Sequence, residues 1–409
     1  MEAWWKTWHE VNQLSRGKKV VLYGRSEDWI PKTLVKLNEQ PQLIVDRNPV
    51  YHGTAYRNIP VISPEEFLQL DRSSLYVVIT SGVYEGIVTF LVENGFQSGT
   101  DFCNSPEYRD YSLLEDIRNY RQDIIVSCSD YHDNTMTRYS RAGGGLYKYS
   151  IGPNTLERLV KGSFRQIVRA KDSLFAIEFV ELKLYQFDCE FKIQHVYDLD
   201  AANYCGLDYD PVRDQLILIN ASQDTISLHR RDNFELVQRV AYSDKNLADG
   251  VTSQHHVNDC CVHGDYLYVT YFSHSGNWKR GIHDGGVSEF HLDRLQDGPT
   301  QLVRNLWKPH SPKMLNGELC YLDSMRGRFY TNDQVVAGEF PGFARGLEFD
   351  GRFYYIGQSE DMYMSRRFGT TNNIMLNAGF FLFDNDTKAS RFYPMLDNMN
   401  VHDLLIVDK

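Results

Sequence analysis

Residues 18–106 alternate short apolar runs with stretches of helical periodicity. The apolar runs, each bounded by turn residues, predict buried strands at 18–24 ("KKVVLYG"), 41–49 ("PQLIVDRNP") and 74–81 ("SLYVVITS"). The stretches between them predict helices at 29–39 ("WIPKTLVKLNE"), 63–70 ("SPEEFLQL") and 84–95 ("YEGIVTFLVENG"). Strands that alternate with helices at this pitch predict a parallel, Rossmann-like sheet.

The pattern changes after residue 122. Residues 1–17 and 107–122 read as helices before and after the α/β domain at 18–106, whereas residues 123–409 read as strands alone. Within this last segment one phrase recurs: a strand, a polar residue with Gly or Asp, then an aromatic strand. It starts near positions 164, 204, 256, 310 and 344. Intervals of roughly 34 to 54 residues are typical of propeller blades.

A sixth blade is divided between the two ends of the strand-rich segment. "IIVSCSD", "GGLYKYSIG" and "TLERLVKG" supply three strands with no innermost strand before them. "NVHDLLIV", the last apolar run of the chain, supplies the missing strand. Because this pairing leaves no free sheet edge, we predict a six-bladed β-propeller at 123–409 that the C-terminal strand closes. The fold class is therefore a multidomain α/β plus all-β protein.

Composition and net charge limit the kinds of partner that we expect for the chain. The net charge of -11 provides no general attraction to nucleic acid. The amino terminus lacks the apolar core of a signal peptide, and no run of about 18 apolar residues predicts a membrane span. Seven cysteines are scattered without CxxC spacing, which indicates reduced thiols. A cytoplasmic location is expected, and a homo-oligomer is left open.

The first predicted strand ends in "YGRSED", where a dinucleotide fold would show GxGxxG. Of those glycines only Gly24 is in place, so a classical NAD site is not expected. Asp46 ends the second strand, where an acid could bind a ribose or cap a turn.

Two resemblances extend this interpretation. The order "VVLYG…LIVDRNPVYHG…IPVISPEEF…YVVITS…FLVENGF" resembles the Rossmann-like domain of sugar O-acetyltransferases, which implies a nucleotide-sugar site at Gly24, Arg25, Ser26 and Asp46. Arg25, Ser26 and Glu27 replace that family's glycines and small residues. The phrases "HVNDCC", "PHSPKMLNGELCYLDS" and "PGFARGLEFDGRFYYIGQS" resemble an uncharacterised bacterial family of predicted propeller fold. The second resemblance implies the fold and no activity.

Polar side chains gather where the predicted innermost strands begin. Aligning the blades on their turn glycines matches Asn258 with Ser311 and Arg345, and the terminal "VHD" with "VND". Arg165 and Tyr204 take the corresponding places in the other two blades. Since a lone buried polar group costs several kcal/mol, these residues need a ligand, water or one another. The candidate catalytic residues are His256, Asp259, His310, Arg345, His402 and Asp403.

Two kinds of chemistry suit this set. The three histidines His256, His310 and His402, with Asn258 and with Asp259 or Asp403, could hold a divalent ion such as Mn, Fe or Zn. An oxygen-only calcium site is a second possibility, with ligands from Asn258, Asp259, Asn220 and Asp403. Alternatively, a histidine acts as general base or acid without metal, and Arg345 pairs with an anionic group. Long insertions at 273–286 and 365–373 are candidate lids.

These observations lead to two hypotheses. In the first, the chain is an enzyme of bacterial glycan or nucleotide-sugar metabolism, a hydrolase, lyase or epimerase that acts on an activated or phosphorylated sugar at the channel mouth. In the second, it is a non-catalytic scaffold that binds a glycan or a glycosyltransferase partner, because propellers host both roles.

Overall fold

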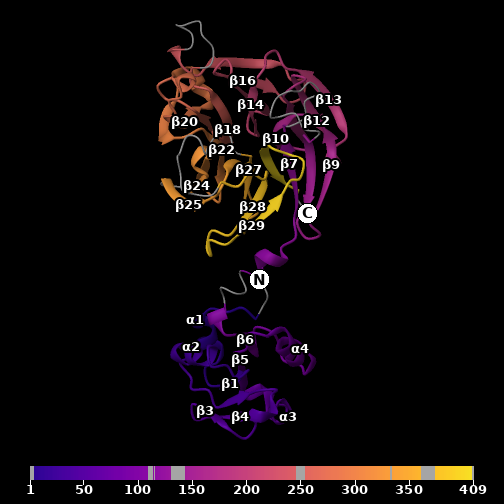
Figure 1. The fold of residues 1–409 in the computed structure, drawn as a ribbon, viewed down its shortest axis with the longest axis vertical. Coiled ribbons are helices and arrows are strands. Elements are labelled where there is room, and N and C mark those ends of the chain that lie inside the picture. The colour runs from indigo at the N-terminus through magenta and orange to yellow at the C-terminus, as the bar shows by residue number, and fades with distance from the viewer. Residues whose placement is uncertain are drawn as a thin grey trace. The chain divides into compact units, whose positions relative to one another are not determined.

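The computed structural model of the chain describes residues 4–108, 114, 116–129, 143–245, 254–331, 334–360 and 374–407. They form two compact units, Met1–Asp116 and Ile117–Lys409 (Figure 1). In the described residues, no helix is both long and apolar enough to cross a membrane. The candidate lid at 365–373 and residues 109–113 of the predicted connecting helix lie outside this part of the chain.

The N-terminal unit is one six-stranded sheet with helices. Its strands are β1 (Lys19–Tyr23), β2 (Leu43–Val45), β3 (Ala55–Tyr56), β4 (Ile59–Ile62), β5 (Leu75–Ile79) and β6 (Phe102–Asn104), in the order β3-β4-β2-β1-β5-β6. Its helices are α1 (Trp8–Leu14), α2 (Trp29–Lys36), α3 (Pro64–Phe67) and α4 (Glu85–Glu93), with 3₁₀ turns η1 (Pro49–Tyr51), η2 (Arg72–Ser74) and η3 (Pro106–Tyr108). The predicted strands and helices all occur, with shorter bounds.

The predicted parallel sheet is a mixed sheet. The pairs β4–β2, β2–β1, β1–β5 and β5–β6 are parallel, whereas β3 pairs with β4 in the antiparallel sense. Arg57 and Asn58 join β3 to β4, and both have positive φ angles, of 51° and 66°. Two such residues in a row form the tight turn that twisted hairpins favour. The sequence prediction missed this hairpin because arginine gives no turn signal.

The second unit is the predicted six-bladed propeller. Described residues form six four-stranded sheets. The first three blades contain β10 (Phe164–Ala170), β11 (Ser173–Glu178), β12 (Lys183–Phe187) and β13 (Ile193–Asp198); β14 (Tyr204–Asp210), β15 (Gln215–Asn220), β16 (Thr225–Arg230) and β17 (Leu236–Ala241); and β18 (Val257–His263), β19 (Tyr266–Tyr271), β20 (Gly285–His291) and β21 (Thr300–Leu306).

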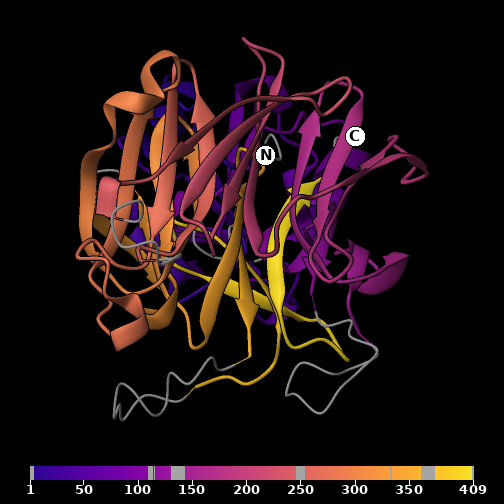
Figure 2. The same ribbon diagram turned by 90° about the horizontal axis from the view of Figure 1, so that it is seen from above.

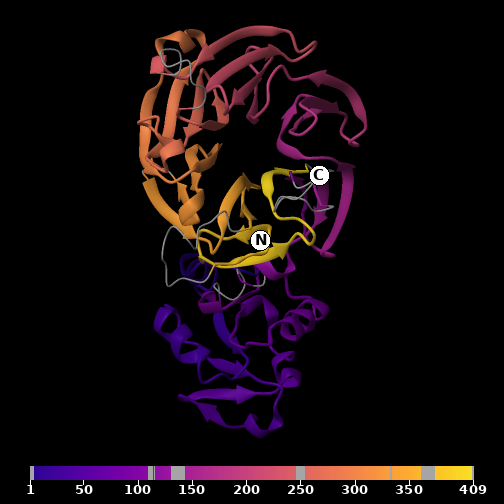
Figure 3. The ribbon, with the colours of Figure 1, turned by 45° about the horizontal axis from the view of Figure 1, so that its top comes forward.

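The other three blades complete the ring, which Figures 2 and 3 show from two directions. They contain β22 (Pro309–Leu315), β23 (Glu318–Asp323), β24 (Arg328–Thr331) and β25 (Val335–Glu339); β26 (Phe343–Phe349), β27 (Tyr354–Ser359), β28 (Gly379–Phe383) and β29 (Ser390–Pro394); and β30 (Val401–Ile406), β7 (Asp123–Cys128), β8 (Gly145–Ser150) and β9 (Thr155–Lys161). Three 3₁₀ turns lie between strands: η4 (Trp278–Arg280), η5 (Leu292–Asp297) and η6 (Ser324–Arg326).

The C-terminal strand closes the ring as predicted. β30 pairs antiparallel with β7, from Val401 opposite Cys128 to Ile406 opposite Ile124. Each innermost strand contacts the next, and β30 contacts both β26 and β10. Burial follows position in the blade, because β15 is almost entirely buried between neighbouring blades whereas the outermost strand β13 is mostly exposed. The apolar core therefore lies between the blades.

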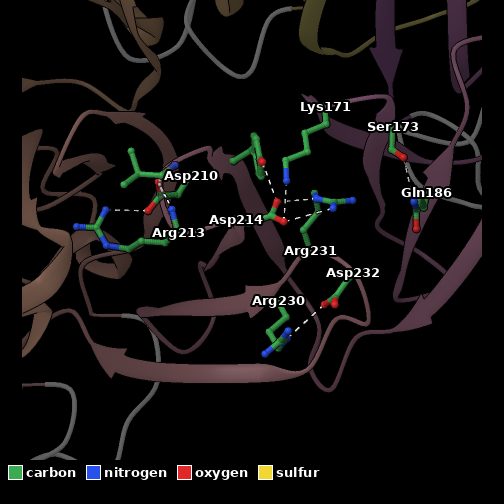
Figure 4. Close-up of polar contacts among 11 residues, drawn as sticks. Lys171, Ser173, Gln186, Asp210, Arg213, Asp214, Arg230, Arg231 and Asp232 are labelled. Carbon is green, nitrogen blue, oxygen red and sulfur yellow. Dashed lines mark hydrogen bonds and ion pairs between the residues drawn. The ribbon is translucent and has the colours of Figure 1, made fainter.

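Charged residues join neighbouring blades on the rim opposite the start of the innermost strands. Asp214, in the turn between β14 and β15, binds Lys171 of the first blade at 2.8 Å and Arg231 at 2.7 Å (Figure 4). These two cations lower the pKa of the Asp214 carboxyl. Arg213 binds Asp210 at 3.0 Å and also Asp293 of the third blade at 2.8 Å. The first three blades are thus tied together by ion pairs at this rim.

Candidate functional site

A β-bulge interrupts each innermost strand shortly after it begins. The register shifts fall between residues 164 and 167, 204 and 206, 257 and 260, 310 and 313, 344 and 347, and 401 and 403. The residues within the bulges are Arg165 and Gln166, Cys205, Asn258 and Asp259, Ser311 and Pro312, Arg345 and Gly346, and His402. Bulges re-aim side chains and occur beside functional sites. This repeated bulge places the aligned polar positions of all six blades around one axis.

A cavity of about 510 Å³ lies where these bulges meet. Three cationic side chains line it: Arg165, Lys308 and Arg345. So do the three predicted histidines, His256, His310 and His402, and the amides of Gln166, Asn203, Asn258 and Asn400. Phe179, Phe272, Trp278 and Phe343 supply aromatic wall, and no aspartate or glutamate is among the described residues of the lining. The volume suits a small organic ligand.

Each of the three cations lies over an aromatic ring. The guanidinium carbon of Arg165 is 3.4 Å from the centre of the Phe179 ring. The corresponding distance is 5.1 Å for Arg345 over Phe343, and the Lys308 ammonium lies 5.8 Å from the Phe272 ring. These distances are in the range of cation–π attraction.

His310 is fixed with one ring nitrogen available as a base. Its Nδ1 lies 2.9 Å from the carbonyl oxygen of Lys308 and 2.7 Å from the hydroxyl of Ser324. Because a carbonyl can only accept, Nδ1 carries the hydrogen and Nε2 keeps the lone pair. Burial, together with the charge of Arg345, holds the pKa of His310 well below its ordinary value. The imidazole is therefore neutral near pH 7, with the Nε2 lone pair unprotonated.

His402 has a different role, because Arg345 occupies its lone pair. Arg345 Nη1 lies 2.6 Å from Nε2 and 3.1 Å from Nδ1 of that ring. An arginine only donates, so the histidine accepts and stays neutral. Burial and then the charges of Arg345 and Arg165 lower the pKa of His402. The pair acts as one unit in which the imidazole orients the guanidinium.

His256 is packed between aromatic rings. Its ring centre lies 4.3 Å from that of Phe272 and 4.4 Å from that of Trp278. Its backbone φ is 53°, which is unusual for a residue other than glycine and marks strain held by the surroundings. Burial, followed by the charges of Arg165 and Lys308, lowers the pKa of His256 to about 3.

This lowered pKa predicts an acid-sensitive fold. Unfolding returns the His256 pKa to about 6.5, so between pH 3 and 6.5 the unfolded chain binds more protons than the folded one. The free energy of unfolding should therefore fall as the pH falls below 6.5. We expect His256→Gln to reduce this fall by about 1–2 kcal/mol between pH 6.5 and 5, measured by urea unfolding. His195→Gln, at an exposed position, is the control; equal slopes in His256→Gln and wild type would contradict the prediction.

The four predicted metal ligands lie in one cavity, but the described residues do not form a ligand cluster there. His256, His310, His402 and Asn258 all line the cavity, as expected. Within the described ranges, however, no three His, Cys, Asp or Glu side chains come together closely enough to hold an ion. The Arg345 guanidinium takes the lone pair that His402 would give a metal, and the three cations of the lining repel one.

Asp259 and Asp403, predicted as catalytic, lie beneath this cavity. With Asp208 and Lys313 they line a second cavity of about 30 Å³ on the axis. Asp259 Oδ2 accepts from the backbone N–H of Ser311 at 2.9 Å, so the carboxylate links the third blade to the fourth. Burial and the charge of Asp403 raise the pKa of Asp259 to about 7. These carboxylates connect blades at the centre of the ring.

The sequence prediction missed part of the lining. Cys205, not Tyr204, faces the cavity in the second blade, because the bulge shifts the register by one residue there. Tyr204 is in the core and donates to Asp200 at 2.8 Å. Lys308, whose φ is 53°, was also missed. It directly precedes β22, as His256 precedes β18, which is the signal that could have found it.

The predicted nucleotide-sugar residues of the N-terminal unit have structural contacts. Both Asp46 carboxylate oxygens accept backbone N–H groups, from Arg25 at 2.6 Å and Asn48 at 2.8 Å. The Ser26 hydroxyl accepts from the Trp29 N–H at 3.2 Å, at the start of α2. A Cβ on Gly24 would lie 2.5 Å from the Ser81 Cβ, so glycine is needed there for β1 and β5 to approach. The Asn48 contact is that of a turn cap, whereas the Arg25 contact links the segments that follow β1 and β2.

Comparisons with known proteins place the second unit in a family. The family described as "Domain of unknown function (DUF4915)" matches residues 145–377, more than half of the chain. No curated protein matches. A nidogen–laminin complex chain is 11% identical with a TM-score of 0.47, covering 70% of this chain and 98% of its own. A protein of unknown function from Bacteroides caccae is also 11% identical at 0.47, with coverage of 71% and 100%. The calcium-binding protein regucalcin from Agrobacterium tumefaciens strain C58 is 12% identical at 0.38, covering 57% and 74%.

Proposed function

The chain belongs to the DUF4915 family, and we propose that it is an enzyme of sugar metabolism that binds an activated or phosphorylated sugar in the channel-mouth cavity and moves a proton with His310. The observation that carries the proposal is the combination in one cavity of a neutral histidine, held by Lys308 and Ser324, with three cationic side chains. The histidine supplies a base, and the cations supply the affinity for an anion.

The charge of the cavity favours an anionic ligand. Arg165, Lys308 and Arg345 come from three different blades and converge on the same space. The charges also act on the histidines, since Arg165 and Arg345 lower the pKa of both His256 and His402 beyond the effect of burial. Arginine matches the oxygen geometry of phosphate and carboxylate groups, and lysine binds phosphate as a point charge.

The rest of the lining suits a sugar ring. Asn258 is 5% exposed, lines the cavity and makes no side-chain hydrogen bond to the described residues. Such an amide needs a donor or acceptor from a ligand or water, and a sugar hydroxyl offers both. Phe272 and Trp278 provide apolar faces beside it. Hydroxyl groups and an anionic group on one small ring would therefore satisfy both parts of the lining.

Proton transfer follows from this arrangement. The Nε2 lone pair of His310 takes a proton either from a carbon next to a carbonyl group or from an attacking water. The negative charge that develops on the substrate is stabilised by Arg345 and Arg165 without reorganisation, because both are already in place. Elimination, epimerisation and hydrolysis all begin in this way.

We propose that the N-terminal unit is Rossmann-like and binds a nucleotide sugar. The support is its strand order, in which β2 and β5 lie on opposite sides of β1. A crevice that binds ligands in α/β folds lies at the carboxyl end of the strands, where the order reverses in this way.

The test of the proposal is ligand binding by the full chain. Sugar phosphates, nucleotide sugars and the corresponding neutral sugars are compared by thermal shift and then calorimetry. We expect a phosphorylated or nucleotide-linked sugar to bind, and Arg345→Met to weaken its binding by about 30-fold or more, because a charge-assisted contact worth about 2 kcal/mol or more is lost. Arg304→Met, at an exposed arginine of β21, is the control. Equal affinity for neutral and phosphorylated sugars would contradict the proposal.

A further inference from the structure

We infer that Phe179, Phe272 and Phe343 are specificity-determining residues for the anion, because each holds one cation of the cavity on its ring face. The inference rests on the proposed function and deepens it, since it names what sets the affinity of the site for anions. The three phenylalanines come from different blades and line the same cavity as their partners.

The three contacts repeat one arrangement with different neighbours. Phe179 follows β11 in the first blade and lies beneath the Arg165 guanidinium, whereas Phe343 begins β26 and lies two residues before its partner, Arg345. Phe272 follows β19 of the third blade and holds Lys308 of the fourth. The pairs thus include a contact between blades and contacts within one blade, so no single local sequence rule explains them.

An aromatic ring positions a cation in a different way than a carboxylate does. The negative face of the ring attracts the ammonium or guanidinium group but carries no net charge. The ring itself therefore cancels none of the cation's charge, while it narrows the range of orientations of the cation and so reduces the entropy lost on binding. An aspartate at the same position would cancel most of the charge. The structure places rings at all three positions.

The experiment measures binding of inorganic phosphate and sulfate to the full chain by calorimetry. We expect Phe179→Leu to weaken phosphate binding by about tenfold, because leucine is apolar but has no ring face for Arg165. Phe179→Tyr should keep the affinity within about twofold, since the ring is retained. Phe343→Leu and Phe343→Tyr repeat the comparison at Arg345. Phe191→Leu, at a half-buried ring of the same blade that does not line the cavity, should leave phosphate binding unchanged.

The outcomes separate this inference from the proposed function. Phosphate binding that the leucine variants retain at the wild-type affinity overturns the inference alone. The same follows if the tyrosine variants lose as much as the leucine variants, because packing and not the ring face would then matter. A wild-type chain that binds neither phosphate, sulfate nor any sugar phosphate overturns both. Phe179 is only half-buried, so its variants test the inference even if Phe343→Leu fails to fold.

Discussion

Replacing His310 with glutamine is expected to slow proton exchange between a bound sugar derivative and solvent by about 10²–10⁴-fold. Glutamine keeps a polar group of similar size but has no lone pair of comparable basicity. The affinity for the ligand should change far less, because the charges of Arg165, Lys308 and Arg345 are retained. The measurement is deuterium incorporation into the ligand in D₂O, followed by NMR, with affinity determined separately on the same variant.

Two further variants show whether His310 acts as the base. Ser324→Ala removes the 2.7 Å contact to Nδ1 but leaves the Lys308 carbonyl, so exchange should slow only modestly, by about tenfold or less. Because burial and Arg345 depress the pKa of His310, the wild-type rate should stay level from pH 8 down to pH 6. A rate that falls with a midpoint near 6.5, or exchange that His310→Gln leaves intact, would contradict the assignment.

The propeller could be predicted from the sequence because its blades repeat the same local pattern of strands and turn residues. The turn glycines Gly264, Gly317 and Gly351 have positive φ angles and mark the same turn in three of the blades. The closing strand could be predicted because "NVHDLLIV" was the one apolar run left without a place. In the N-terminal unit the hairpin at Arg57 and Asn58 was missed, because its turn needs two positive φ angles and an arginine does not indicate such an angle.

The site was predicted only in part, because the sequence shows which residues are aligned but not which way a bulge turns them. His256, His310, Arg345 and His402 line the cavity as expected, whereas the bulges send their neighbours Asp259 and Asp403 to the layer beneath. Alternation along a strand predicts only that adjacent residues point to opposite faces of the sheet. The bulge also places their side chains in two different cavities, which alternation does not predict. Aromatic partners such as Phe179 were missed because their positions depend on turns outside the repeat.

The layer beneath the cavity yields the second large expected effect, a loss of propeller stability in Asp403→Ala. Asp403 lies on the closing strand β30, where its Oδ2 accepts from the N–H of Ile167 in the first blade at 3.3 Å and its Oδ1 from Leu404 N–H at 2.9 Å. It is 5% exposed and its charge acts on the half-buried Lys313. Alanine would remove the side-chain acceptor of two backbone N–H groups at a buried position. We expect a loss of about 2–4 kcal/mol in the free energy of unfolding.

Chemical unfolding of the full chain, followed by circular dichroism, measures this loss. Asp198→Ala, at an exposed residue of β13, should change the free energy by about 0.5 kcal/mol or less and serves as control. Asp403→Asn keeps one acceptor, so its free energy of unfolding should lie between those of wild type and Asp403→Ala.

The pH dependence of stability gives a second test. Burial raises the pKa of Asp403 to about 6, so between pH 3.8 and 6 the folded wild type binds more protons than the unfolded chain. Its stability therefore falls as the pH rises through this range. The advantage of wild type over Asp403→Asn should therefore narrow from pH 4 to pH 7, and a gap that widens would show that the closing carboxylate is stabilised in its charged form.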